Sequence, residues 1–258
     1  MVSGDMMQIR VIVNGAYGKM GSLACDTIKN HPDFQLVAGL GRDDNLQDAI
    51  ADTSAQIVIE LTRADCVYEN SLTIINSGVH PVIGASGLLD KQIQTLNDMC
   101  AEKKLGGIIV PNFSIGAVLM MQFAAIAARF LPEVEIIEAH HQQKLDAPSG
   151  TAIKTAEMIA AARRGSKNQL ALKELIPGAR GASLHDVNIH SLRLPGVLAR
   201  QQVLFGSQGE TLSITHDSID RASFMPGVIL ACQGVLKINT LYYGLEHLLE
   251  DSVSLKHP

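Results

Sequence analysis

The chain has 258 residues, of which 47% are hydrophobic and 18% charged, and its formal net charge at pH 7 is −5. Because no surplus of positive charge is present to neutralise phosphates, the charge argues against a nucleic-acid-binding protein, and an aromatic content of 4% without tryptophan argues against a surface that stacks bases. The length predicts one large domain or two domains of roughly 100–150 residues.

The cysteines and the apolar segments indicate the compartment. Cys25, Cys66, Cys100 and Cys232 form no CxxC pair, so buried free thiols are expected rather than a disulfide framework or a metal site. The N-terminus has no basic segment followed by an apolar one. The longest apolar stretch, residues 115–131, is interrupted and shorter than the ~20 residues of a membrane span. We expect a cytoplasmic protein with no membrane partner.

Apolar, β-branched runs alternate with helical stretches in the N-terminal part of the chain. Strands are expected at residues 8–14, 35–40, 56–61, 80–83 and 107–110. Helices are expected at residues 22–30, 67–77 and 90–104, with a short amphipathic piece at 48–51. This alternation is typical of a parallel sheet with crossover helices, and the nearly continuous apolar character of the strands predicts that helices cover both faces.

The pattern changes after Pro111. A long, almost entirely apolar helix is expected at residues 115–130 and should be deeply buried, followed by a strand at 134–139 and a helix at 151–164. Short strands at 187–194, 201–205 and 211–216 then predict an α+β domain with an open antiparallel or mixed sheet. The segment 224–249 is strongly helical and is expected to return to the first domain. The predicted domains are therefore residues 1–111 with 224–258, and residues 112–223.

A glycine cluster between the first strand and the first helix indicates a dinucleotide site. Gly15, Gly18 and Gly21 have the spacing GxxGxxG, with Tyr17 where the commoner GxGxxG motif has its middle glycine. Glycines at this place allow a tight turn and a close approach of the backbone to a pyrophosphate at the helix N-terminus. The predicted coenzyme-binding residues of this loop are Gly15, Ala16, Tyr17, Gly18, Lys19 and Met20.

The end of the second strand bears on the choice of coenzyme. An acidic residue normally binds the adenosine ribose hydroxyls there, but this chain has Gly41, unless Asp43 or Asp44 reaches back. Arg42 is placed to receive a 2′-phosphate, so we expect NADPH to be used at least as well as NADH. The alternative is that Arg42 is an ordinary solvated charge of the loop.

The segment from Glu138 to Ala152 carries the densest polar chemistry of the chain. His140 and His141 are adjacent at a strand end and should point to opposite sides, and only Glu138 lies near His140 as a further ligand, so we do not predict a metal site. Ser149 is a plausible N-cap, and the amides of Gly150 and Thr151 with the charge of Lys144 favour a small dicarboxylate. The alternative is a capped helix that follows a solvated loop.

This segment, EAHHQQKLDAPSGTA, resembles the signature of the dihydrodipicolinate reductases, also called 4-hydroxy-tetrahydrodipicolinate reductases. The glycine loop, the run Asn112 to Gly116, and the stretch from Ile214 to Gly227 are similar to further parts of that family, so the resemblance covers about residues 9–235. It implies a Rossmann-like nucleotide domain and a substrate and tetramerisation domain, in a homotetramer. It also implies NADPH- or NADH-dependent reduction of 4-hydroxy-tetrahydrodipicolinate to tetrahydrodipicolinate, on the diaminopimelate and lysine route.

The resemblance also implies residue roles. His140 would donate the proton, because hydride addition at ring C4 leaves an enamine-like carbanion, and Lys144 would be its partner. Contacts to substrate are implied for His141, Lys144, Ser149, Gly150 and Thr151. Contacts to coenzyme are implied for Gly84, Ala85, Ser86, Val110, Pro111, Asn112 and Phe113.

The chain departs from the family at two further places. The family's GTTG coenzyme loop is Gly84-Ala85-Ser86-Gly87 here, which removes one hydroxyl, and its GEH motif is Ala199-Arg200-Gln201, whose role is therefore in doubt. Two alternatives remain: a catalytically silent dinucleotide sensor, or another NAD(P)-dependent dehydrogenase of this architecture. A semialdehyde dehydrogenase would need a nucleophilic cysteine in the second domain, and the only cysteine after Cys100 is Cys232, in the predicted terminal helix.

Overall fold

A computed structural model describes residues 8–163 and 173–252 of the chain. The chain divides into two compact units, which we call the first unit (residues 1–113 and 224–258) and the second unit (residues 114–223). The domain boundaries expected from the sequence, after residue 111 and before residue 224, stay predictions.

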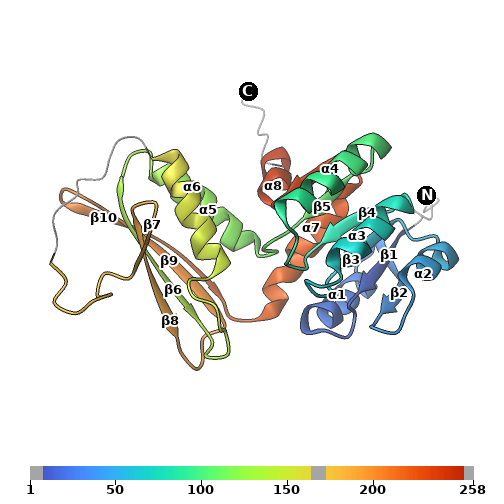
Figure 1. Ribbon diagram of the computed structural model, residues 1–258, viewed down its shortest axis with the longest axis horizontal. Coiled ribbons are helices and arrows are strands. Elements are labelled where there is room, and N and C mark those ends of the chain that lie inside the picture. The colour runs from blue at the N-terminus through green and yellow to red at the C-terminus, as the bar shows by residue number, and fades with distance from the viewer. Residues whose placement is uncertain (1–7, 164–172, 253–258) are drawn as a thin grey trace, which may run out of the picture. The chain divides into compact units, whose positions relative to one another are not determined.

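The first unit is built on a six-stranded parallel sheet with the order β11-β5-β4-β3-β1-β2. Its strands are β1 (Ile9–Asn14), β2 (Phe34–Leu40), β3 (Ile57–Glu60), β4 (His80–Ile83), β5 (Gly107–Ile109) and β11 (Leu241–Tyr243). Its helices are α1 (Lys19–Lys29), α2 (Leu46–Thr53), α3 (Val67–Asn76), α4 (Asp90–Lys103), α7 (Met225–Val235) and α8 (Glu246–Ser252). Figure 1 shows these helices arranged around the sheet.

Alternate residues of the central strands enter two different hydrophobic layers. Ile12 and Val58 pack with Ile50 of α2 and Ile74 of α3, whereas Val11 and Val13 are equally buried and point the other way. Helices α1 and α7 contact each other and supply cover for that second face. Since all six strands run in parallel, their carboxyl ends meet at one edge, where loops that follow β1, β2, β3, β4 and β5 emerge.

The segment 224–249, expected to be strongly helical, also contains a strand that was not predicted. A 3-10 turn (Arg221–Phe224) leads into α7, and the chain then forms β11 and α8. Leu241 to Tyr243 pair with Gly107 to Ile109 of β5, so they complete the edge of the sheet. Pairing with a strand that is distant in the sequence overrides the local helical pattern, and Gly244, at φ +102°, ends the strand.

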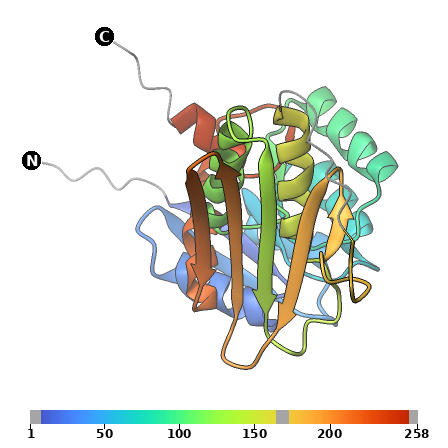
Figure 2. The same cartoon turned by 90° about the vertical axis from the view of Figure 1, so that its left-hand side faces the viewer.

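The second unit holds a five-stranded mixed sheet with the order β10-β9-β6-β8-β7. Its strands are β6 (Glu133–His140), β7 (Ala182–Leu184), β8 (Val187–Arg193), β9 (Ala199–Ser207) and β10 (Glu210–Ser218), and its helices are α5 (Ile115–Ala127) and α6 (Gly150–Ala162). Only β6 and β8 pair in parallel. Helices α5 and α6 contact each other on one face of the sheet, and Figure 2 shows the other face, over which none of the unit's described helices lies.

The predicted fold class, a Rossmann-like parallel-sheet domain with an α+β domain that holds a mixed sheet, is confirmed. The deep burial expected for the apolar helix at 115–130 is wrong, because Phe123, Ile126 and Phe130 are 52%, 53% and 77% exposed. The helix packs on the sheet and on α6 with one side only, so its outward side stays open. Strand β7 was not expected, and residue 164, the predicted end of α6, lies outside the described residues. No helix in the described ranges combines the length and the apolar character that a membrane span requires.

Candidate active site

The glycine loop after β1 needs its glycines for steric reasons. Gly15 has φ +86°, and a Cβ there would lie 2.7 Å from the carbonyl oxygen of Leu61. A Cβ at Gly21 would overlap the Gly15 carbonyl oxygen, so α1 packs directly on the turn. Gly18 is the N-cap of α1 and no side chain caps the helix, which leaves its first amides for an anion.

A cleft of about 1160 Å³ opens at this edge of the first unit. Of the predicted coenzyme residues, Gly15, Tyr17, Gly18 and Arg42 line it. The uncapped start of α1, the tight glycine turn and the size of the cleft fit a dinucleotide with its pyrophosphate on the helix. Asp43 and Asp44, considered from the sequence as residues that could reach back to the ribose position, line the cleft as well. Further lining residues in the loops that follow β2 and β3, and in α3, were not predicted from the sequence: Asn45, Thr62, Arg63, Asp65, Cys66 and Asn70.

A buried carboxyl group links the ends of β1 and β3 through Asn14 and Thr62, which both line this cleft. Glu60, at the end of β3, is fully buried and accepts a hydrogen bond of 2.6 Å from Asn14 Nδ2 at the end of β1. The backbone amide of Thr62 donates to the other Glu60 oxygen over 2.9 Å, and the Thr62 hydroxyl donates to it as well. Burial raises the pKa of Glu60, and the hydrogen bonds oppose that rise.

At the end of β2, where an acidic residue usually binds the ribose hydroxyls, this chain has Gly41, and Asp44 of the following loop lies beside it. The amide of Gly41 donates to Asp44 Oδ2 over 2.7 Å, so an acidic side chain does reach back to the end of β2. A Cβ at Gly41 would lie 2.7 Å from the ring of Tyr17, which shows that the tyrosine covers this glycine. Arg42 lines the cleft beside them.

The other predicted coenzyme residues lie at the same edge of the sheet but do not line this cleft. The amides of Gly84 and Ala85 donate to the Glu60 carbonyl, and Ser86 follows them. The run Val110, Pro111, Asn112 and Phe113 follows β5, and the Phe113 ring closely approaches Gly84. Ala16 is buried, and Lys19 and Met20 open α1.

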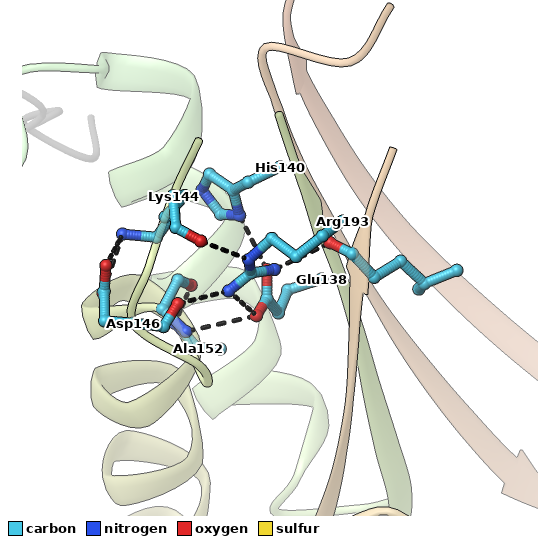
Figure 3. A network of polar contacts seen from close by, with 8 residues as sticks. Glu138, His140, Lys144, Asp146, Ala152 and Arg193 are labelled. Carbon is cyan, nitrogen blue, oxygen red and sulfur yellow. Dashed lines mark hydrogen bonds and ion pairs between the residues drawn. The ribbon is translucent and has the colours of Figure 1, made fainter. Parts of the chain in front are cut away.

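In the second unit, the end of β6 brings a histidine, a carboxylate and a guanidinium together. The parallel pairing of β6 with β8 sets His140 opposite Arg193. His140 Nδ1 lies 2.6 Å from Glu138 Oε2, and the two terminal nitrogens of Arg193 bind the two Glu138 oxygens at 3.0 Å each. Figure 3 shows the imidazole and the guanidinium converging on the one carboxylate.

The protonation states of this cluster follow from its contacts. Burial alone would raise the pKa of Glu138, but hydrogen bonds from Arg193, Ser191 and His140 hold it below its ordinary value. Burial lowers the pKa of His140, the charges of Lys144 and Arg193 act in the same direction, and Glu138 opposes them. The cluster therefore holds an ionised carboxylate against an imidazole that readily gives up a proton.

Lys144 is paired within its own loop. Its ammonium lies 2.9 and 2.7 Å from the two carboxylate oxygens of Asp146, and Figure 3 shows it extended toward that residue. The hydrogen bond from Lys144 lowers the pKa of Asp146. The Asp146 side chain is 65% exposed, so solvent weakens this pair.

The start of α6 has the features expected of an anion site. Ser149 is the N-cap, with its hydroxyl accepting from the Ala152 amide over 3.2 Å, and its own amide donates to Glu138 Oε1 over 3.2 Å. A Cβ built at Gly150 would meet no atom within 4 Å, so the helix start faces open space, and Thr151 follows it. The buried Nδ1 of His141 has no hydrogen-bond partner among the described residues.

The divergent stretch Ala199-Arg200-Gln201 opens β9 and lies beside this site. Gln201 stands opposite Glu138 in the antiparallel pairing of β6 and β9, and its amide nitrogen donates to Thr155 Oγ1 over 2.7 Å. Glu138 and Arg193 are not among the site residues predicted from the sequence. The two-residue spacing from His140 on one strand face signalled Glu138, whereas Arg193 depends on a strand register that sequence does not reveal. Among the described residues, no group of His, Cys, Asp and Glu side chains is arranged to hold a metal ion.

Comparison with known proteins decides the family. Residues 9–113 match the family model described as dihydrodipicolinate reductase, N-terminus, and residues 116–249 match the model described as dihydrodipicolinate reductase, C-terminus. The chain belongs to the dihydrodipicolinate reductase family. The predicted family is therefore confirmed.

Individual relatives agree with this assignment. Curated proteins named 4-hydroxy-tetrahydrodipicolinate reductase from Legionella pneumophila (strain Philadelphia 1) and Coxiella burnetii (strain Dugway 5J108-111) are 69% and 50% identical over 243 residues, which is 94% of this chain and 100% of each relative. The solved structure of dipicolinate-bound dihydrodipicolinate reductase from Paenisporosarcina sp. TG-14 is 43% identical, with a TM-score of 0.87 over 93% of this chain and 99% of that one. GenD2 from gentamicin A biosynthesis, at 14% identity and a TM-score of 0.62, shares the fold.

Membership confirms the predicted activity at the level of the family. The chain is an NAD(P)H-dependent oxidoreductase of the diaminopimelate and lysine route, and its first unit is the NAD(P)-binding domain. Both NADH and NADPH serve this family, as predicted. The roles of single residues stay predictions.

Proposed function

We propose that the chain reduces 4-hydroxy-tetrahydrodipicolinate to tetrahydrodipicolinate with loss of water, and that His140 donates the proton. A bound reduced nicotinamide supplies the hydride to ring C4. The observation that carries the assignment is His140 itself, half-buried, with Nδ1 bound to Glu138 at 2.6 Å, at the end of the strand that leads to the start of α6. This arrangement leaves the other ring nitrogen, Nε2, for the reacting carbon.

The second unit supplies a site for two carboxylates. We assign Lys144, His141 and the start of α6 at Ser149, Gly150 and Thr151 to substrate binding. The open space at Gly150 and the unpartnered Nδ1 of His141 support this assignment, and the solved relative from Paenisporosarcina sp. TG-14 is described with bound dipicolinate. Lys144 would exchange Asp146 for a substrate carboxylate, which brings its charge to bear on the reacting ring.

The first unit holds the coenzyme through its glycine loop and the cleft beside it. Gly15, Gly18 and the start of α1 suit the pyrophosphate, and Arg42 suits a 2′-phosphate because a guanidinium binds phosphate oxygens in pairs. Asp44, at the same place, suits free ribose hydroxyls. Because Arg42 suits the 2′-phosphate of NADPH and Asp44 suits the ribose of NADH, we expect both coenzymes to be used, NADPH at least as well as NADH.

The assembly and the compartment are further predictions made from sequence. We propose a homotetramer, with the subunit contacts in the second unit, on the strength of the family signature in that unit. Size-exclusion chromatography with light scattering should give four times the mass of the 27.7 kDa chain. A cytoplasmic location stays a prediction.

A coupled assay tests the reaction. The substrate is generated by a synthase from pyruvate and aspartate semialdehyde, and the loss of absorbance of the reduced coenzyme is followed. We expect turnover that requires all components, and we expect Lys144→Ala to lower kcat/KM by roughly 10²-fold or more through the loss of a charge-assisted contact. Coenzyme oxidation that does not depend on the synthase product, or full activity in Lys144→Ala, would contradict the proposal.

A further inference from the structure

The guanidinium of Arg193 is engaged on all sides. Its two terminal nitrogens bind the two carboxylate oxygens of Glu138 at 3.0 Å each. Its Nε donates to the carbonyl of Lys144 over 3.2 Å, and Nη2 also donates to the carbonyl of Asp146 over 2.5 Å. A further bond of 2.7 Å goes to the carbonyl of Leu192. One side chain of β8 thus ties the backbone of the loop after β6 to a carboxylate on β6.

Both carboxylate oxygens of Glu138 also have two hydrogen-bond partners each. Oε2 faces His140 Nδ1 at 2.6 Å and an Arg193 nitrogen, and Oε1 accepts from the other Arg193 nitrogen and from the Ser149 amide over 3.2 Å. The side chain is fully buried. An ionised carboxylate offers only acceptors, so the contact with His140 requires a hydrogen on Nδ1. The imidazole is therefore held with Nδ1 as the fixed donor and Nε2 as the nitrogen whose proton can leave.

We propose that Glu138, held in place by Arg193, is a positioning residue for the reaction: it fixes the orientation and the tautomer of His140 and ties the loop that carries Lys144 to the start of α6. This inference rests on the proposed role of His140 as proton donor. A carboxylate behind a catalytic imidazole is known to orient the ring and to stabilise its protonated form. Arg193 in turn keeps Glu138 ionised in a place that water does not reach.

The charges around His140 predict the direction in which its pKa changes when the charge of Glu138 is removed. The groups that face it are Glu138 on its own strand, Arg193 on β8 and Lys144 on the loop, and Lys144 is partly neutralised by Asp146. Glu138 is the one that favours the imidazolium. Removing its charge leaves two cations beside His140, so His140 should lose its proton at lower pH.

The variant Glu138→Gln tests the predicted direction of this pKa change. Because a general acid works only while protonated, turnover falls as the pH rises through the pKa of His140. We expect kcat of Glu138→Gln to drop by roughly 10²-fold, and the alkaline limb of its pH profile to move to lower pH by roughly one to two units. The KM for coenzyme should stay unchanged. Titration of the His140 ring signals by NMR, assigned with His140→Gln, should show the same shift.

A matched control lies on the same strand. Glu135 also binds a histidine and an arginine, with Oε2 2.8 Å from His190 Nε2 and Oε1 bound to Arg180. We expect Glu135→Gln to break a similar but partly exposed trio without moving the pH limb. If Glu138→Gln does not fold, because it leaves the Arg193 charge without its partner, the double variant Glu138→Gln with Arg193→Met takes its place. It should fold, and its alkaline limb should move in the same direction but less far, because the Arg193 charge that also disfavours the imidazolium is gone.

The outcomes separate the inference from the proposed function. A Glu138→Gln or double variant with wild-type turnover and pH limb would overturn the positioning role, while an inactive His140→Gln would leave the proposed function standing. Full turnover in His140→Gln would instead overturn the role of His140, and the inference with it. A limb that moves equally in Glu135→Gln would also overturn the inference, because the effect would not be specific to Glu138.

Discussion

Arg42 and Asp44 bring opposite charges to the end of β2, where we propose that the adenosine end of the coenzyme binds. Asp44 is already bound to the Gly41 amide, whereas the described residues offer Arg42 no ion-pair partner. A 2′-phosphate pairs with the guanidinium and is repelled by the carboxylate. Free ribose hydroxyls instead donate hydrogen bonds to the carboxylate and do not need the guanidinium. We therefore expect the balance between the two coenzymes to depend on these two side chains.

Substitution of either side chain should shift the balance in opposite directions. Arg42→Ala should raise the KM for NADPH roughly tenfold or more, the loss expected for a charged hydrogen bond, and leave the KM for NADH nearly unchanged. Asp44→Asn should raise the KM for NADH instead. Steady-state kinetics with each coenzyme give the ratio, and an unaltered ratio in Arg42→Ala would show that the arginine is only a solvated charge.

His140 should titrate differently before and after substrate binds. Burial lowers the pKa of His140 in the free protein, so the alkaline limb of kcat/KM should lie below the ordinary histidine value of about 6.5. A bound dianionic substrate favours the imidazolium, so the limb of kcat should lie at higher pH. Rate profiles measured across pH give both limbs, and a kcat limb at or below that of kcat/KM would argue against His140 as the acid.

At the scale of elements, two helices of the second unit begin in the same way. Ser149 caps α6 by accepting from the Ala152 amide, and Ser114 caps α5 by accepting from the Ala117 amide over 3.3 Å. Both serines are buried, at 3% and 2% exposure. Only the start of α6 is assigned to substrate binding. Substituting each serine in turn therefore separates an effect on stability from an effect on substrate binding.

Both Ser149→Ala and Ser114→Ala should lower the free energy of unfolding by about 1 kcal/mol, the usual loss for an N-cap, and Ser114→Ala also removes the contact of this hydroxyl with His216 Nε2 at 3.0 Å. Ser149→Ala should also raise the substrate KM, because the amides at the start of α6 lose their order. Denaturant unfolding and kinetics on the same preparations provide the comparison. An equal rise of KM in both variants would mean that general loosening, not the start of α6, weakens substrate binding.

The elements that could be predicted from sequence are those whose pattern is local. The five strands of the first half could be predicted because each is a short run rich in apolar residues, and β3 and β5 are buried along their whole length. Strand β11 was missed because its three residues become a strand only by pairing with β5. His140, Lys144 and Ser149 lie within one segment and could be read from it, whereas Arg193 reaches the site only through the β6–β8 register. Tertiary pairing carries no local signal.

At the scale of the whole molecule, the net charge of −5 conceals two local cationic sites. Arg42 in the first unit and Lys144 with the start of α6 in the second provide positive charge where anions are expected. The pKa values of buried titratable groups are shifted in different directions in the two units. Burial raises the pKa of Glu60 in the first unit, whereas the pKa values of Glu138 and His140 in the second are lowered.

Mild acid should therefore act differently on the two units. A lowered histidine pKa contributes stability that is lost as the pH falls below about 6.5, and a lowered carboxyl pKa contributes stability that is lost as the pH falls below about 4.5. The raised pKa of Glu60 gives the first unit stability as the pH falls. Hydrogen exchange by mass spectrometry at pH 7 and pH 5, corrected for intrinsic rates, should show faster opening in the second unit alone. Equal loss of protection in both units would contradict this.

The dependence of the reaction on His140 is tested by measuring turnover and coenzyme affinity on the same preparation of His140→Gln. Glutamine keeps a polar group near Glu138 but cannot donate a proton that titrates near neutrality. We predict that turnover falls by roughly 10²-fold or more and loses its alkaline limb, while the coenzyme Kd stays at the wild-type value. Wild-type turnover with the limb intact would show that another group delivers the proton.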